Sequence, residues 1–244
     1  MIKLSTLSVV CGFALMVAAA PPVSASNLAP EVETRAAPHQ ELMLFLMRGP
    51  GDPTLFEGKR VAVVIENGAD AVTLLLARDY FLEQGATVEV LTPRGKDEPR
   101  LDPARRSASS VTARDYADNE RRITVDAFLD ETEPGRYEAI YLPGNHPDTQ
   151  TAESNPQIAG YAARATSAGK PVFAVGDSSL WLARANLLRG RHATGSRALQ
   201  PFLVWSGVEV QDEPVVRDDL IYTSRDAFDL PKLMAVMTQL LTIQ

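Results

Sequence analysis

The stretch that decides the fold runs Arg60-Val-Ala-Val-Val-Ile65, Ala71-Val-Thr-Leu-Leu-Leu-Ala-Arg-Asp-Tyr-Phe-Leu-Glu-Gln84, Thr87-Val-Glu-Val-Leu-Thr92. Its first part is continuously apolar, which is typical of a strand buried on both faces of a parallel sheet. Apolar residues in the second part recur at helical spacing and stop at Gly85, a common residue after a helix. A strand, a helix and a strand in this order predict a right-handed β-α-β unit.

The alternation of strands and helices continues along the chain. Pro171-Val-Phe-Ala-Val175 is another buried strand, and Gly176-Asp-Ser-Ser179 leads from it into a helix that extends to Leu187. These segments predict an α/β fold: a flavodoxin-like, doubly wound parallel sheet in a three-layer α/β/α sandwich. The other predicted elements are strands at Tyr137–Leu142 and Ile123–Asp126, helices at Pro156–Ala168 and Leu230–Leu241, and paired strands within Pro214–Ser224 that turn at Asp218-Asp219.

The first 25 residues have the pattern of a signal peptide. Lys3 precedes an apolar run from Leu7 to Ala20, and Val23-Ser-Ala25 supplies small residues for cleavage. We therefore expect a periplasmic or secreted protein with no stable membrane insertion after cleavage; the alternative is an uncleaved anchor, for which the apolar run is short. The one cysteine, Cys11, lies in this segment, so the mature chain would have no thiolate catalyst, disulfide or cysteine metal site.

Residues 26–57 form an extension to a single domain at 58–244. Residues 27–40 are rich in Ala, Pro and Glu, which favours a linker, and Glu41–Met47 is predicted to form a short apolar helix that packs on the domain or on a partner subunit. The chain carries a net charge of −7 and has no basic patch with interleaved aromatic residues, so we expect no nucleic-acid partner.

Several segments resemble, in order and spacing, those of the ThiJ/PfpI superfamily, also called DJ-one/PfpI, which is related to class I glutamine amidotransferases. The resemblance covers Lys59 to Leu241, most of the chain without its signal peptide. Its strongest parts are the opening β-α-β unit, Tyr137-Glu-Ala-Ile-Tyr-Leu-Pro-Gly144, and Gly169-Lys-Pro-Val-Phe-Ala-Val175. It implies the fold predicted above and, because family members are commonly dimers, a homodimer. Trp181 and Trp205 are then expected in the core or at the dimer interface.

The chain departs from the family pattern where the family carries its chemistry. The pattern Cys-His/Ala-Gly of the nucleophile elbow is Gly176-Asp177-Ser178 here, as in the C-terminal domain of large-subunit catalases, which this elbow resembles. Asp70 stands for the family's acidic partner, and Asn145 replaces the second glycine of Pro-Gly-Gly. Ser196 matches the loop in which some members carry a catalytic histidine. The family's cysteine-based glyoxalase, deglycase and amidase activities therefore do not transfer.

Three interpretations of the elbow stay open. Glycine adopts the strained backbone conformation of a nucleophile elbow at almost no cost in conformational energy. Gly176 can therefore form the turn without a nucleophilic side chain. Asp177 or Ser178 then caps the following helix, or the elbow binds a ligand, or Ser178 is a displaced nucleophile. Asp70 is either the cap of its own helix or a pocket residue. If Asp70 and Asp177 both face the pocket, their proximity raises one pKa, and the pair suits acid–base chemistry or a cation.

The predicted function follows from these residues. We expect a non-catalytic module that binds a small anionic or carbonyl ligand or a protein partner. The alternative is an amidase- or peptidase-like hydrolase that uses Ser178, or the Asp70/Asp177 pair, with His146. Three scattered histidines and no available cysteine make a poor metal site, so we expect neither metal nor cofactor. The predicted ligand-binding residues are Asp70, Gly144, Asn145, His146, Gly176, Asp177 and Ser178.

Overall fold

A computed structural model describes residues 39–96, 110–115, 117, 119–145 and 155–243. The chain divides into two units, residues 1–36 and 37–244, and all described residues belong to the second. The proposed signal peptide, most of the linker at 27–40 and His146 lie outside the described residues.

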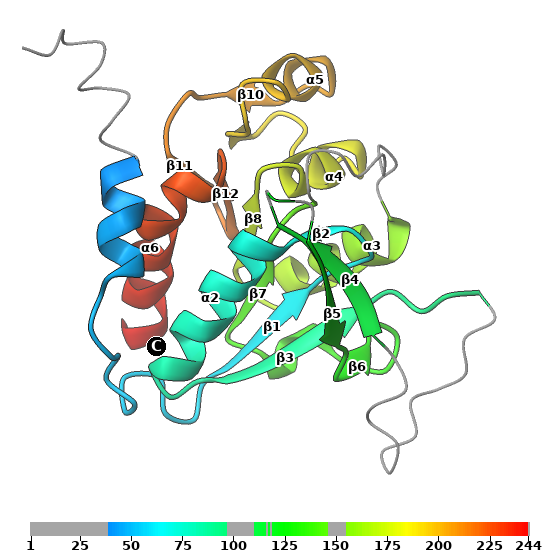
Figure 1. The fold of residues 1–244 in the computed structure, drawn as a ribbon. Helices are drawn as coiled ribbons and strands as arrows, with labels where there is room; N and C mark the ends of the chain where they lie inside the picture. The colour runs from blue at the N-terminus through cyan, green and yellow to red at the C-terminus, as the bar shows by residue number, and fades with distance from the viewer. Residues whose placement is uncertain (1–38, 97–109, 116, 118, 146–154, 244) are drawn as a thin grey trace, which may run out of the picture. The chain divides into compact units, whose positions relative to one another are not determined.

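A seven-stranded sheet with strand order β11-β12-β8-β7-β1-β3-β6 forms the centre of this unit (Figure 1). Every neighbouring pair is parallel except β11 and β12, which form the predicted hairpin at the edge. The predicted parallel, doubly wound sheet is therefore confirmed. Its strands are β1 (Arg60–Val64), β3 (Thr87–Thr92), β6 (Ala127–Phe128), β7 (Ala139–Leu142), β8 (Val172–Val175), β11 (Val215–Asp218) and β12 (Ile221–Ser224).

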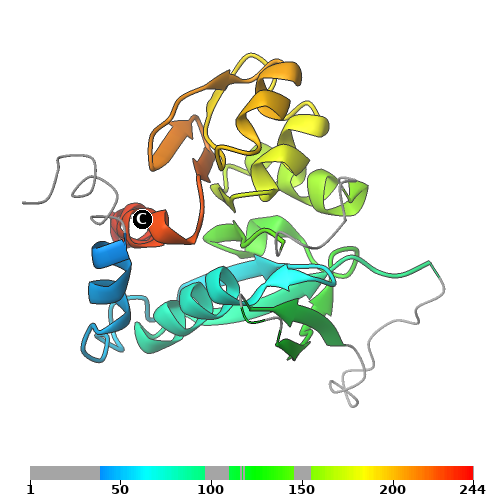
Figure 2. The same cartoon turned by 45° about the horizontal axis from the view of Figure 1, so that its top comes forward.

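Helices cover both faces of the sheet, and the side chains of β1 show why. Val61 and Val63 belong to one buried apolar cluster and Ala62 and Val64 to the other, because successive strand residues point to opposite faces. The first cluster contains residues of α2 (Ala71–Glu83) and α6 (Leu230–Ile243), and the second contains residues of α3 (Pro156–Ser167) and α4 (Ser178–Arg184). Figure 2 shows the helices on the two sides of the sheet, as the three-layer prediction requires.

A small second sheet has two of its three strands in the polar region between β3 and β6. Its strands are β2 (Ala69–Asp70), β4 (Ser110–Arg114) and β5 (Glu120–Thr124), and β4 pairs antiparallel with β5. The strand predicted at Ile123–Asp126 is thus β5, which begins three residues earlier and ends at Thr124. Shorter elements are η3 (Pro134–Arg136), β9 (His192–Ala193), α5 (Gln200–Trp205), β10 (Glu209–Val210) and η4 (Ala227–Asp229).

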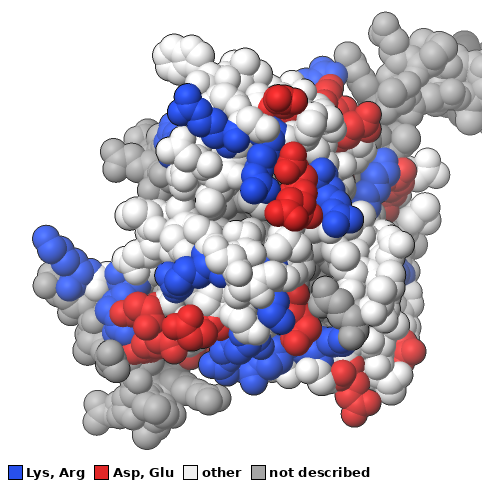
Figure 3. All heavy atoms as spheres, turned by 180° about the vertical axis from the view of Figure 1, so that it is seen from behind, with Lys and Arg blue, Asp and Glu red and all other residues white. Residues whose placement is uncertain are grey.

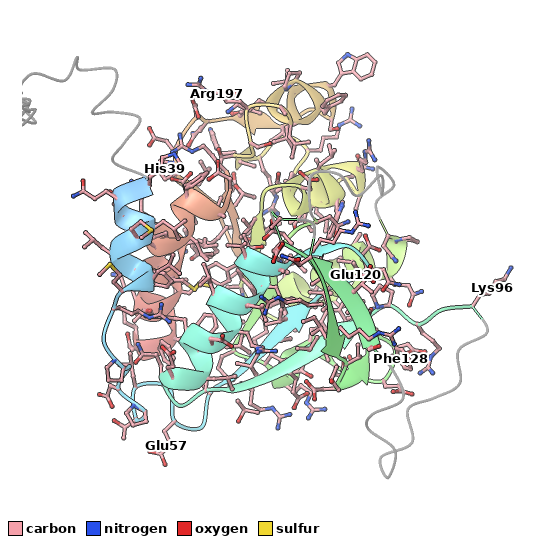
Figure 4. The ribbon with its side chains drawn as sticks, in the orientation of Figure 1. His39, Glu57, Lys96, Glu120, Phe128 and Arg197 are labelled. Carbon is pink, nitrogen blue, oxygen red and sulfur yellow. The ribbon has the colours of Figure 1, made fainter. Side chains whose placement is uncertain are left out.

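Residues 39–46 form the predicted apolar helix, which lies beside α6 (Figure 1). Phe45 packs on Tyr80 of α2 with ring centroids 5.5 Å apart, and Glu41 forms an ion pair of 3.2 Å with Lys232. His39 at its start contacts the ring of Phe228, at 4.2 Å between centroids (Figure 4). The helix therefore packs on its own domain. Among the described residues, no helix combines the length and apolar character that a membrane crossing requires.

The chain after this helix crosses directly over the turn between α2 and β3. Gly85 in that turn has φ of +87°, and a Cβ built on it would stand 1.9 Å from the carbonyl oxygen of Pro53. The extension and the first β-α-β unit thus fit together only with glycine at position 85.

We predict that Gly85→Ala lowers the free energy of unfolding by more than about 2 kcal/mol, from the left-handed φ and the backbone clash together. Gly160→Ala is the matched control, since a Cβ there, within α3, meets nothing within 4 Å. It should stabilise the protein by about 0.5–1 kcal/mol. Urea unfolding of the two variants measures both values, and a Gly85→Ala variant as stable as the parent would contradict this packing.

Candidate functional site

The carboxyl ends of β7 and β8 converge beside the start of α2. Gly144 has φ of +84°, and a Cβ on it would lie 2.6 Å from the carbonyl oxygen of Val175 at the end of β8. The backbone N–H of Asp70 donates to the Gly144 carbonyl at 3.1 Å, and Ala69 forms a β-bridge with Asn145. Glycine at 144 therefore allows three chain segments to meet at one edge of the sheet.

Asp70 caps α2, as one of the two interpretations of this residue predicts. Its side chain accepts from the Thr73 N–H at 2.8 Å and lies 3.1 Å from the Thr73 hydroxyl. That hydroxyl is also 2.8 Å from the Pro143 carbonyl oxygen, and the Tyr141 hydroxyl donates to the Thr73 carbonyl at 3.0 Å. These contacts fix the first turn of α2 to the end of β7.

Gly176 and Asp177 form the turn between β8 and α4. Gly176 has φ of +56°, in the left-handed region that the strained elbow was expected to require. Its N–H donates to the Ser224 carbonyl at 3.0 Å. The Asp177 side chain makes no capping hydrogen bond, so the interpretation of Asp177 as a helix cap is wrong. Burial, and secondarily the charge of Asp70, raise the pKa of the Asp177 carboxyl.

Ser178 is fully buried and its hydroxyl donates to the Leu142 carbonyl at 3.1 Å. It therefore ties the start of α4 to the end of β7 and does not cap its own helix. The neighbouring Ser179 hydroxyl donates to the Gly176 carbonyl at 2.7 Å. The two hydroxyls that follow the elbow are thus both bonded to backbone carbonyls, and Ser178 does not line the adjoining cavity.

A cavity of about 350 Å³ opens at this edge of the sheet. Four of the seven predicted ligand-binding residues line it: Asp70, Asn145, Gly176 and Asp177. Gly144 lies in the turn behind it, Ser178 is buried in its wall, and His146 is outside the described residues. The other lining residues are Thr73, Pro143, Val175, Ser196, Ala198, Leu199, Arg225, Asp226 and Ala227.

Ser196, in the loop in which some family members carry a catalytic histidine, lines the cavity. Arg225 and Asp226 also line it, but they were not predicted from the sequence. Both directly follow β12, and the rule that ligands bind beyond the carboxyl ends of parallel strands would have found them. Arg225 binds Asp229 at 2.6 and 3.1 Å and Asp212 at 3.1 Å. Burial raises the pKa of Asp226, whose side chain accepts from the Phe228 N–H at 2.9 Å.

The lining is consequently rich in carboxyl groups. Asp70, Asp177 and Asp226 face the same cavity as Arg225, and the Arg225 guanidinium already has two carboxylate partners. Such a lining repels anions and favours a neutral ligand or one that donates hydrogen bonds. Among the residues that the structure describes, no three His, Cys, Asp or Glu side chains are placed to hold a metal ion.

Comparison with known proteins identifies the family. The DJ-1/PfpI family matches residues 59–240, three quarters of the sequence, and the chain belongs to this family. The resemblance found in the sequence is therefore confirmed. Two solved structures with the same fold are DJ-1beta of Drosophila melanogaster (TM-score 0.61, 19% identity, 76% of this chain and 91% of that one) and a ThiJ/PfpI family protein from Pseudomonas syringae (0.60, 21%, 77% and 71%).

Relatives of similar sequence have varied names. Protein/nucleic acid deglycase 2 of Escherichia coli (strain K12) is 33% identical over 113 residues, which are 46% of this chain and 65% of that protein. General stress protein 18 of Bacillus subtilis (strain 168) is 32% identical over 111 residues, 45% of this chain and 63% of that protein. The chain thus matches somewhat less than two thirds of the length of these two relatives.

We predict that ionisation of the Asp177 carboxyl lowers the free energy of unfolding as pH rises. In the unfolded chain an aspartate titrates near about 3.9; in the folded protein burial and Asp70 raise the Asp177 pKa. Above the unfolded value only the unfolded state loses its proton at first, so stability falls until the folded pKa is passed. Asp177→Asn should remove this fall and give a higher Tm than the parent at pH 7, with the difference vanishing below pH ~3.5.

The control for this prediction is Asp70→Asn, which keeps a good helix cap and removes the charge that faces Asp177. Carbon-detected NMR of the Asp177 carboxyl should show its pKa moving down in Asp70→Asn. An Asp177 that titrates at or below the ordinary value, or that ignores the substitution at 70, would contradict the shared site.

Proposed function

We propose that this member of the DJ-1/PfpI family is an exported, non-catalytic binding protein that has lost the family's cysteine nucleophile and holds a small carbonyl compound in the cavity described above. One observation carries the proposal: the residue at the turn between β8 and α4 is Gly176, in a left-handed conformation and with no side chain to react. The resemblance puts the nucleophile at this position. A cavity lies beside this turn.

The positions of the chain's one cysteine and of Ser178 support the same proposal. The chain's one cysteine is Cys11, in the segment with the pattern of a signal peptide, which also supports a periplasmic or secreted location. A serine nucleophile needs a general base and a path to the substrate. The Ser178 hydroxyl instead donates to a backbone carbonyl inside the protein.

A homodimer remains a proposal that rests on the resemblance alone.

The lining of the cavity supports one of the two expected ligand classes, the carbonyl compound. An anion would meet three carboxyl groups and an arginine that already has two carboxylate partners. A neutral carbonyl compound avoids that repulsion. Since its pKa is raised, the Asp177 carboxyl keeps its proton to a higher pH than an ordinary aspartate and can donate it in a hydrogen bond to a carbonyl oxygen. We therefore favour a small neutral carbonyl ligand.

A second candidate function is acid–base hydrolysis by Asp70 and Asp177. It is favoured by one observation, that the two carboxyls line one cavity and that Asp70 contributes to raising the Asp177 pKa. Pairs of carboxyls with separated pKa values are the usual basis of acid–base catalysis. Activity names among the relatives, such as deglycase, do not distinguish the candidates, because cysteine chemistry is not available at Gly176.

The test exposes the purified protein to a neutral 2-oxoaldehyde and follows two signals at once. We expect saturable changes in the amide NMR signals of Gly176 and Asp177, and no consumption of the compound beyond a protein-free control. Ala198→Phe, at the exposed rim of the cavity, should weaken the binding by narrowing its mouth.

The outcomes separate the candidates. Consumption of the compound that is lost in Asp177→Asn would show acid–base catalysis on the carbonyl compound and contradict the non-catalytic proposal. If the 2-oxoaldehyde causes neither a shift nor turnover, while a panel of small anions does shift the Gly176 signal, the proposed ligand class is wrong.

A further inference from the structure

Helix α5 lies at one end of the described unit, next to α4 (Figures 1 and 2). Three of its apolar side chains are exposed. Phe202, Val204 and Trp205 are 51%, 59% and 92% exposed, whereas Leu203 between them is fully buried. The helix therefore packs on the domain through Leu203 and leaves its other three apolar side chains exposed to solvent. Of the two tryptophans expected in the core or at a dimer interface, Trp181 is buried in the core and Trp205 is not, so a dimer interface stays the remaining prediction for Trp205.

Two arginines lie near Trp205. Arg184 is the last residue of α4, and Arg189 follows in the loop, with its Nε 3.8 Å from the position that a Cβ on Gly207 would take. Both line a shallow cleft of about 250 Å³ together with Trp205 and Asn186. Within the described ranges neither guanidinium has a carboxylate partner, in contrast to the nearby Arg191 and Arg225.

The composition of this surface is that of a protein-binding hot spot. Tryptophan and arginine are the residues that most often dominate interface energetics, and an exposed tryptophan offers a large rigid contact area. A guanidinium binds a carboxylate through two parallel hydrogen bonds. On the face seen in Figure 3, basic and acidic side chains are mixed and no broad basic surface is formed.

We propose that the surface formed by Arg184, Arg189, Phe202, Val204 and Trp205 binds an acidic segment of a partner protein, with an apolar side chain of that segment on Trp205 and its carboxylates on the two arginines. Charge complementarity selects this partner. The two guanidiniums, which have no carboxylate partner among the described residues, can each bind a carboxylate beside the exposed Trp205 ring. A membrane surface is disfavoured, since α5 has only six residues and the net charge opposes anionic lipid.

The test uses tryptophan fluorescence, because the chain has two tryptophans and only Trp205 is exposed. The probe is the acidic peptide acetyl-Glu-Phe-Glu-Glu-Leu-Glu-amide, titrated into the full-length protein. We expect a saturable blue shift that weakens with added salt. Arg184→Glu with Arg189→Glu should lower the affinity at least about 10-fold, whereas Arg121→Glu, an exposed arginine of β5, should leave it unchanged.

Further measurements keep the result unambiguous. Calorimetry with Trp205→Ala should show lost affinity, and thermal unfolding of each variant checks that the fold persists. A peptide with lysine in place of glutamate should not bind. The proposal is overturned by equal affinity of parent and charge-reversed protein, by no saturable shift, by stronger binding to anionic vesicles, or by sedimentation showing that Trp205 serves self-association instead.

Discussion

The close approach of the turn after β7 to the end of β8 is the constraint on which the rest of the site depends. A Cβ at position 144 would stand 2.6 Å from the Val175 carbonyl oxygen, nearer than real side chains come. With glycine there, the Gly144 carbonyl accepts from the Asp70 N–H, Ser178 reaches the Leu142 carbonyl, and Thr73 reaches Pro143. The first turn of α2, the end of β7 and the start of α4 are thereby held around one cavity.

The carboxyl groups gathered at this edge of the sheet influence one another. Asp70 and Asp177 face one cavity, and both burial and the charge of Asp70 raise the pKa of Asp177. The turn between β8 and α4 contains Gly176, which contributes a left-handed backbone conformation and no side-chain functional group. The hydroxyls of Ser178 and Ser179 are bonded to backbone carbonyls, and three carboxyls are among the polar side chains that line the cavity. A hydrogen bond from a protonated carboxyl is the interaction that such a lining supplies most readily.

The sequence predicts the parts of this structure that depend on local pattern. The apolar run of β1, the helical spacing of α2 and the cap at Asp70 follow from burial and from hydrogen-bonding needs that each segment carries by itself. Arg225 and Asp226 enter the cavity through the pairing of β12 with β8, a contact between segments nearly fifty residues apart that periodicity cannot report. The direction of the Ser178 hydroxyl likewise depends on where β7 lies. Strand β4 was missed and β5 was predicted only in part, because most side chains of the hairpin that they form are polar or exposed.

The most direct test of the central claim, that no activated nucleophile remains beside Gly176, is reaction of the purified protein with a fluorophosphonate serine probe and mapping of any adduct by mass spectrometry. A buried hydroxyl bonded to the Leu142 carbonyl should not react, so we predict no adduct on Ser178 while a serine hydrolase treated alongside is labelled. An adduct on Ser178 that disappears in Ser178→Ala would show an activated serine and contradict the account.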